Sequence, residues 1–222
     1  MTDAHCHVSC GDASIREFLI GRDFFGVHPW DVPEDASARA AALESVRSAL
    51  VANPSAGVGE IGLDRLRSRE IPPCMRDMFA AQLALAAELE RPVVLHGAKC
   101  WGQVVAAVKA VVASNPHGLK RPLVFHGFSR SDGLVPEIVS MGGYISVGPA
   151  ILNDHAVNYR ELAKAIPEDR ILVETDRTAE SEPVSVRDVL EKLAEVRGVS
   201  ADALERTTDA NAEAVCGGSG VD

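Results

Sequence analysis

Short, unbroken runs of apolar residues alternate along the chain with longer stretches in which apolar residues recur at helical spacing. Runs without strict polar alternation are typical of parallel strands that are covered on both faces. We predict seven such strands, at residues 1–7, 23–29, 55–62, 92–97, 122–128, 143–148 and 170–176. The segments between them predict amphipathic helices, as at 74–90 and 184–198, where Gly198 can end the second helix. Repeated βα units of this kind form either an open doubly wound sheet or a barrel.

Almost every predicted strand ends in a polar side chain that can take part in chemistry. These residues are His5, His7, His28, Glu60, His96, His126 and Asp176. In a barrel the carboxyl ends of all strands converge on one mouth, whereas an open sheet offers only the crevice at its switch point. We therefore predict an α/β fold with a TIM-like (β/α) barrel. Only about twenty residues separate His7 from His28, too few for two further βα units, so we expect an incomplete or distorted barrel of about seven strands.

Length and composition limit the class of protein. The 222 residues fit one domain, which we place at 1–216, followed by a flexible tail at 217–222. The net charge of −10 argues against a membrane surface and against non-specific grip on duplex DNA. Five scattered cysteines do not form a disulfide pattern, and no signal peptide or membrane-spanning run is visible. We expect a cytoplasmic protein with reduced thiols.

The first strand carries a metal-binding pattern. Residues i and i+2 of a strand point to the same face, so His5 and His7 face the mouth together and Cys6 faces away. Imidazole suits borderline cations such as Zn and Mn, and carboxylates balance their charge. Four histidines with Glu60 and Asp176 supply enough donors for two divalent ions that share a carboxylate, an arrangement used for phosphoryl and acyl hydrolysis.

Several segments resemble the TatD family of metal-dependent hydrolases within the amidohydrolase-like barrels. They include "DAHCHV", "GVHPW", "GVGEIGLD", "LVFHGFSRS" and "IPEDRILVETD", which appear in family order and cover roughly residues 2 to 177. The resemblance implies that His5 and His7 hold one metal, His96 and His126 hold the other, and Glu60 bridges them. It further implies that Asp176 binds the first metal and activates a water, and that His28 faces the substrate phosphate. The implied activity is a DNase or other phosphodiesterase that uses Mg, Mn or Zn.

The loops beyond the strands depart from the family pattern, and the departures add cations. Arg65 follows the third predicted strand, Lys99 follows His96, Arg130 follows His126 and Arg177 follows Asp176. Cations at the mouth would suit an anionic substrate, and Lys99 is the best single candidate, with Arg65 and Arg130 beside it. The alternative is that nearby acidic residues neutralise these groups.

Two further residues have open roles. Asp3 could support a ligand histidine, or it could be a solvated residue at the start of the chain. Trp30 could offer a stacking face for a base, but we expect it to pack over the barrel rim.

Two alternatives to the nuclease hypothesis stay open at this point. The same ligands hydrolyse lactones, amides, small esters and phosphate monoesters in related barrels, although many of those enzymes use a carbamylated lysine where this chain has Glu60. The other alternative is a non-catalytic barrel with a structural metal. A full set of ligands argues against that second alternative.

Overall fold

The computed structural model describes residues 1–114, 119, 121–129 and 132–216, and within these ranges every paired strand is parallel. A small sheet pairs β1 (Thr2–Cys6) with β2 (Arg16–Leu19). A six-stranded sheet has the order of the sequence, with β3 (Phe24–Phe25), β4 (Gly57–Asp64), β5 (Val93–Ala98), β6 (Leu123–Phe125), β7 (Gly143–Val147) and β8 (Ile171–Val173). The predicted α/β fold is confirmed. The predicted tail at 217–222 and Arg130 lie outside the described residues.

The described part of the chain has eight strands rather than seven, because β2 was not predicted. No helix separates β1, β2 and β3. Regular βα units would place one helix between β1 and β2 and another between β2 and β3. The two sheets meet at both sides without merging. Ile20 forms an isolated bridge with Phe24, and at the other side Asp176 donates its backbone N–H to the carbonyl of His5 at 2.9 Å. The barrel is therefore incomplete in its hydrogen bonding, as expected.

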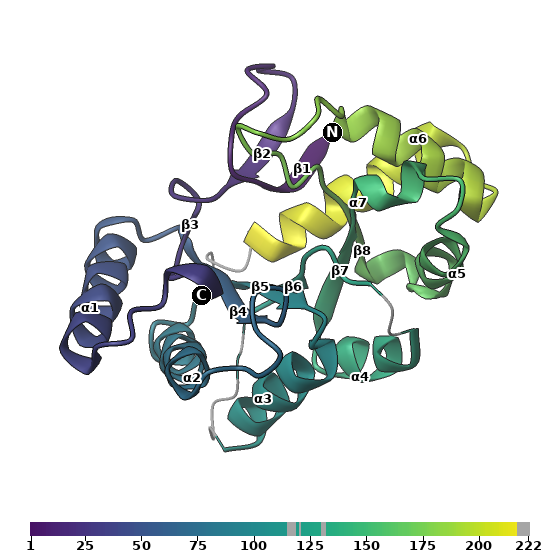
Figure 1. The fold of residues 1–222 in the computed structure, drawn as a ribbon. Helices are drawn as coiled ribbons and strands as arrows, with labels where there is room; N and C mark the ends of the chain where they lie inside the picture. The colour runs from purple at the N-terminus through teal and green to yellow at the C-terminus, as the bar shows by residue number, and fades with distance from the viewer. Residues whose placement is uncertain (115–118, 120, 130–131, 217–222) are drawn as a thin grey trace.

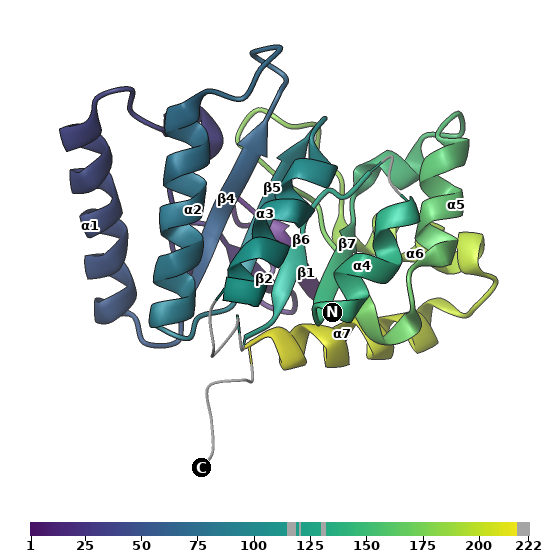
Figure 2. The ribbon, with the colours of Figure 1, turned by 90° about the horizontal axis from the view of Figure 1, so that it is seen from below.

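The helices cover the outside of the six-stranded sheet. Helices α1 to α6 surround it in chain order, and α7 lies across the end of the strands opposite to their arrow tips (Figures 1 and 2). Their bounds are α1 Ala36–Ala52, α2 Pro73–Glu88, α3 Trp101–Ser114, α4 Val135–Ser140, α5 Val157–Ala165, α6 Val186–Arg197 and α7 Ala201–Cys216. Short 3₁₀ helices occupy Pro29–Asp31, Asp132–Leu134, Pro149–Leu152 and Glu168–Arg170. In the described part of the chain, none of the helices is long and apolar enough to cross a membrane.

Alternation along the strands separates two apolar layers. One side chain of each pair, such as Leu95 on β5 and Phe125 on β6, packs against the helices in the larger core. The next position, such as Val94 and Val124, points into the barrel with Tyr144. Ala212 and Val215 of α7 pack against this inner layer. Two positions further along β5, and correspondingly beyond the end of β6, the inward side chains are His96 and His126, so the apolar floor lies directly under the polar mouth.

Candidate metal centre

Glu60 on β4 is the centre of the polar mouth, and five histidines surround its carboxylate. Oε1 lies 2.5 Å from His96 Nδ1, 2.6 Å from His126 Nε2 and 3.8 Å from His28 Nε2. Oε2 lies 3.2 Å from His7 Nε2 and 3.5 Å from His5 Nε2. The two oxygens of one buried carboxylate thus face two different sets of imidazoles.

The polypeptide around Glu60 allows two strands to approach closely. Gly62 has a φ of 156°, and a Cβ at this position would lie 2.0 Å from the carbonyl oxygen of His96. Any side chain here would therefore force β4 away from β5. The glycine in "GEIG" lets the strand that carries Glu60 lie directly beside the strand that carries His96.

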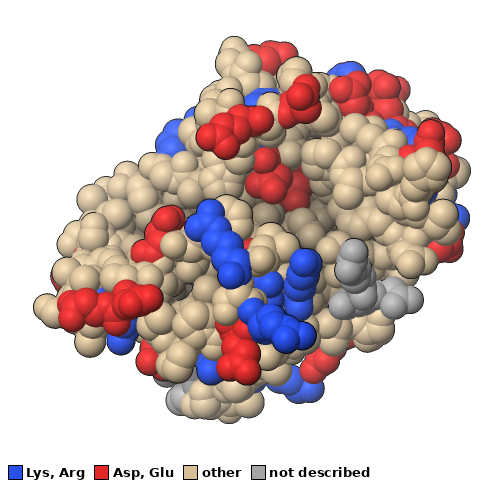
Figure 3. Space-filling model, in the orientation of Figure 1, with Lys and Arg blue, Asp and Glu red and all other residues tan. Residues whose placement is uncertain are grey.

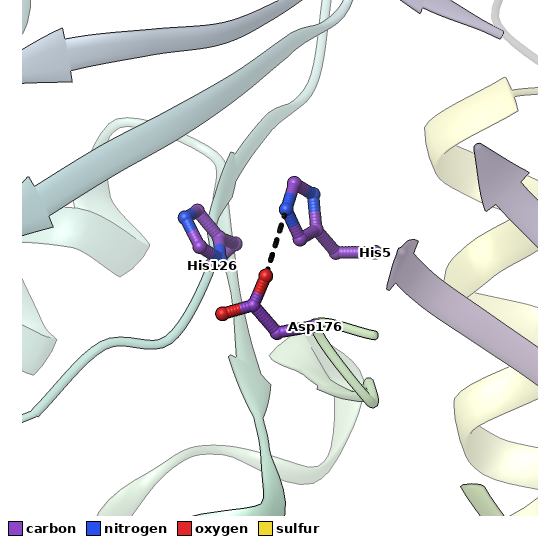
Figure 4. A group of neighbouring side chains, drawn as sticks. All are labelled: His5, His126 and Asp176. Atoms are coloured by element: carbon purple, nitrogen blue, oxygen red, sulfur yellow. Dashed lines mark ion pairs between the residues drawn. The ribbon is translucent and has the colours of Figure 1, made fainter. Parts of the chain in front are cut away.

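Asp176 enters the mouth from the loop after β8 and points toward His5 and His126 (Figure 4). Its Oδ1 lies 3.5 Å from Nε2 of both His5 and His7, and its side chain is 48% exposed. The residue has a φ of 49°, a left-handed conformation that needs support from its surroundings. Asp3 supplies that support, because its carboxylate accepts the backbone N–H of Thr175 at 2.9 Å and the Thr175 hydroxyl at 2.6 Å. Asp3 is therefore buried and steadies the loop that carries Asp176, and it does not contact a histidine ring.

The electrostatics of the mouth favour bound cations. Burial opposes protonation of His126, but the carboxylate of Glu60 outweighs it and raises the pKa of His126 well above its usual value. The carboxylates of Asp176 and Glu60, at 3.5 and 3.2 Å from His7 Nε2, raise the pKa of His7 to about 9. Burial would raise the pKa of Asp176, yet the nearby imidazoles of His5 and His7 hold it below its ordinary range. The same carboxylates that attract protons to these imidazoles would stabilise divalent ions.

A second, independent observation about His5 supports a metal site formed by these donors. His5 is completely buried, yet both of its ring nitrogens have no hydrogen-bond partner among the described residues. A buried polar atom without a partner costs about 1–3 kcal/mol, so a ligand for this ring is favoured. His5 belongs to two groups whose donor atoms all lie within 4.8 Å of one another, one with His126 and Asp176 and one with His7 and Glu60. Imidazole and carboxylate donors at this spacing could hold divalent ions.

His28 differs from the other histidines in its hydrogen bonding. Its Nδ1 accepts the backbone N–H of Trp30 at 3.1 Å, so a neutral ring carries its proton on Nε2, which faces the mouth. Burial lowers the pKa of His28, which favours this neutral form. Gln82 on α2 holds the preceding residue, because its amide bonds to both the N–H and the carbonyl of Val27. His28 therefore presents the N–H of Nε2 to the mouth as a hydrogen-bond donor, and it does not present a free lone pair there.

Two carboxylates contact the histidines from behind, and neither was predicted. Asp64 at the end of β4 accepts from His96 Nε2 at 2.9 Å and is almost completely buried. This bond leaves Nδ1 of His96 as the lone pair that faces the centre. Glu174 lies 3.6 Å from His126 Nδ1 and accepts the backbone N–H of Gly127 at 2.6 Å and the hydroxyl of Ser146. Asp64 lies in the "GLD" segment and Glu174 in the "ETD" segment, and both segments stood out in the sequence. Their roles were missed because the histidines that they contact come from other strands.

We expect Asp64→Asn to weaken divalent-ion binding by about 10–100-fold, because the amide no longer holds His96 in the orientation that presents Nδ1. Competition with a chromogenic chelator measures the change. Asp77→Asn on the exposed surface of α2 removes the same charge and is the control. Equal affinities of both variants and the unmutated protein would show that Asp64 does not orient His96.

The mouth opens into two cavities that share His96, His126 and Asp176. The larger, of about 650 Å³, extends past Lys99 and Leu66 toward the start of α3. The smaller, of about 380 Å³, contains His7, His28, Glu60 and Trp30. Figure 3 shows acidic atoms deep in a hollow on this face, with Lys and Arg side chains grouped along one side of it.

The structure separates the predicted mouth cations from one another. Lys99 is exposed and lines the larger cavity, as expected. Arg65 is exposed but lines neither cavity, and its Nε donates to the carbonyl of Arg69 at 2.9 Å. Arg177 points elsewhere, with a guanidinium nitrogen 3.7 Å from Glu17 of β2 and another 3.2 Å from the carbonyl of Val184. Arg177 thus ties β2 to the loop after β8, and its expected place among the mouth cations is wrong.

Trp30 is also not where we expected it. Its side chain does not pack into the rim, because it is 44% exposed and lines the smaller cavity. Cys6 does follow the prediction: it is buried on the side away from the mouth, with its thiol 3.8 Å from the carbonyl of Phe18. In the part of the chain that the structure describes, none of the five cysteines forms a disulfide.

Comparison with known proteins gives one consistent family. Residues 13–217 match the family described as TatD related DNase. The chain is 31% identical over 207 residues to the 3′-5′ ssDNA/RNA exonuclease TatD of Klebsiella pneumoniae (strain 342), which covers 86% of this chain and 75% of that protein. It is 29% identical over 165 residues to an uncharacterized metal-dependent hydrolase, YabD, of Bacillus subtilis (strain 168), which covers 70% of this chain and 63% of that protein.

Solved structures show the same fold. The crystal structure of YJJV, a TatD homolog from Escherichia coli K12, matches with a TM-score of 0.73 at 24% identity and covers 93% of this chain and 78% of that one. A TatD family hydrolase from Entamoeba histolytica matches with a TM-score of 0.71 at 17% identity, and covers 91% of this chain and 75% of that one.

Proposed function

The chain belongs to the TatD related DNase family of metal-dependent hydrolases, and on that premise we propose that it hydrolyses phosphodiester bonds of single-stranded nucleic acid with two divalent ions. The relative from Klebsiella pneumoniae is named for single-stranded DNA and RNA, which supports this substrate class. The observation that carries the proposal is the position of Glu60, whose two oxygens face separate sets of histidines.

We assign the ligands from this division. Glu60 with His5 and His7 would hold one ion, and Glu60 with His96 and His126 would hold the other. Asp176 completes the first set, because its Oδ1 is equally close to His5 and His7. The exposed side of Asp176 leaves room for a water molecule beside it.

The chemistry follows from the residues that face the substrate. Bound divalent ions would lower the pKa of a water and polarise the phosphoryl oxygens. Asp176 accepts the proton of the attacking water, since its carboxylate is ionised and reaches solvent. His28 donates from Nε2 to a phosphate oxygen, and Lys99 supplies a positive charge on the other side of the mouth. The acidic centre could therefore act on an anionic phosphodiester, because the bound ions and Lys99 would supply the positive charge.

Metal removal tests the function directly. We expect a chelator to abolish hydrolysis of single-stranded DNA and the return of Mg, Mn or Zn to restore it, because no other group in the described mouth replaces the ions as electrophile. The measurement is product formation from single-stranded DNA, duplex DNA, bis-p-nitrophenyl phosphate, a lactone and a dipeptide with each ion. Full activity after chelation would contradict a metal mechanism. Hydrolysis of the lactone or dipeptide alone would favour the small-ester or amide alternative.

A further inference from the structure

Trp30 presents an exposed aromatic ring beside the candidate metal centre. It lies in the short 3₁₀ helix Pro29–Asp31, and its side chain lines the smaller cavity together with Glu60 and Asp176. The ring is 44% exposed, so part of its surface is open to a ligand that enters this cavity. Its position suits contact with a ligand.

The ring is held in one orientation by the residues of the mouth. Its ring centroid lies 5.0 Å from that of His28 at an interplanar angle of 83°. Its side chain also lies beside Asp64, the residue that orients His96, and helps to lower the pKa of that carboxyl. A ring fixed by two neighbours loses little conformational freedom when a ligand stacks on it.

Arg67 covers one face of this ring with its guanidinium group. Its Cζ lies 3.7 Å from the centroid of the Trp30 ring. Among the described residues its guanidinium takes part in no other hydrogen bond or ion pair, and the side chain is exposed on the loop after β4. A stacked guanidinium keeps its N–H edges available for a phosphate.

Resting on the phosphodiesterase function proposed above, we propose that Trp30 is a stacking site for one nucleobase next to the scissile phosphate. Arg67 leaves the ring when the base arrives and pairs with a phosphate that flanks the same nucleotide. Every base has a π-face, so this site accepts any sequence. It requires an unpaired base, because a base inside a duplex is already stacked on its neighbours. The two cavities then divide the substrate, with the base over Trp30 and the adjoining backbone toward Lys99.

The test compares binding of a short oligothymidylate with versions in which one position at a time is abasic. All oligonucleotides carry phosphorothioate linkages to slow cleavage, and affinity to the metal-loaded full chain is measured by fluorescence anisotropy. In the unmutated protein we expect one position at which loss of the base weakens binding about tenfold, a typical contribution of one base–aromatic stack. Trp30→Ala should remove that difference, and Trp30→Phe should retain most of it. The intact and abasic oligonucleotides should then bind the alanine variant equally.

Arg67→Ala tests the second half of the proposal. It should weaken the intact oligonucleotide and reduce its slope of log affinity against log salt by about one, as expected for one phosphate contact. Arg76→Ala, on the exposed surface of α2, removes the same charge and should leave the slope unchanged.

The outcomes separate this inference from the proposed function. If Trp30→Ala weakens intact and abasic oligonucleotides alike, the loss comes from a disturbed His28 or Asp64 and the stacking site is refuted; metal content measured on the same sample shows that disturbance. If the unmutated protein cleaves none of the phosphodiesters with any ion, the proposed function fails, whatever the binding data show.

Discussion

Glu60→Gln should reduce kcat/KM on a phosphodiester by about 10³-fold, the upper end of what loss of one preorganised electrostatic group costs. The amide keeps the shape of the side chain but loses its charge, and its NH₂ group then points a donor at imidazoles that must offer lone pairs to ions. Because one carboxylate serves both sets of histidines, the variant should lose ions from both. Elemental analysis after gel filtration, together with steady-state kinetics, measures the effect.

The control for this substitution is Glu70→Gln, which removes one negative charge from the exposed loop after β4. It should keep the metal content and activity of the unmutated protein. A Glu60→Gln variant that retains two ions per chain would contradict the bridging role, even if its activity were low.

Asp176→Asn should lower kcat by about 10²–10⁴-fold, as expected for the loss of a general base, with a much smaller change in KM. The asparagine cannot accept the proton of the attacking water. His5 and His7 also lie 3.5 and 3.2 Å from Glu60 and remain in place, so the variant should still bind divalent ions, although less tightly. Single-turnover rates and the split between kcat and KM measure the effect.

Asp31→Asn is the matched control, because Asp31 also lines the smaller cavity and is exposed at the mouth. It should change steering of an anionic substrate slightly but leave kcat intact. If Asp176→Asn raised KM and left kcat unchanged, Asp176 would bind substrate and another group would accept the proton.

Most of the fold could be predicted because it depends on local periodicity. The apolar run at 92–97 overlaps β5 except for its last residue, the run at 122–128 contains β6, and the helical stripe with Met75, Met78 and Phe79 is buried in α2. The strand β2 escaped prediction because its four residues include Arg16 and Glu17. Glu17 is buried with its charge compensated, because Ser9 and Cys10 of the preceding loop donate hydrogen bonds to its carboxylate and Arg177 lies beside it.

The candidate site likewise has a part that could be predicted from the sequence and a part that could not. That His5 and His7 point together follows from the two-residue period of a strand, and that His96 and His126 join them follows from the convergence of parallel strands. Neither rule applies to the loops. Arg65, Lys99 and Arg177 looked alike in the sequence, yet only Lys99 lines a cavity, while Arg177 is held by Glu17 and Val184.

The sequence by itself determined which histidines and carboxylates gather at the mouth and toward which end of the strands they lie, because backbone geometry sets the direction of each side chain locally. The tertiary structure alone decided which groups stand behind them and which side chains stay exposed. Asp64 orients His96 from a position 32 residues away, and Trp30 remains open beside Glu60. These features depend on contacts between segments that are remote in the chain, and such contacts exist only after the strands have paired.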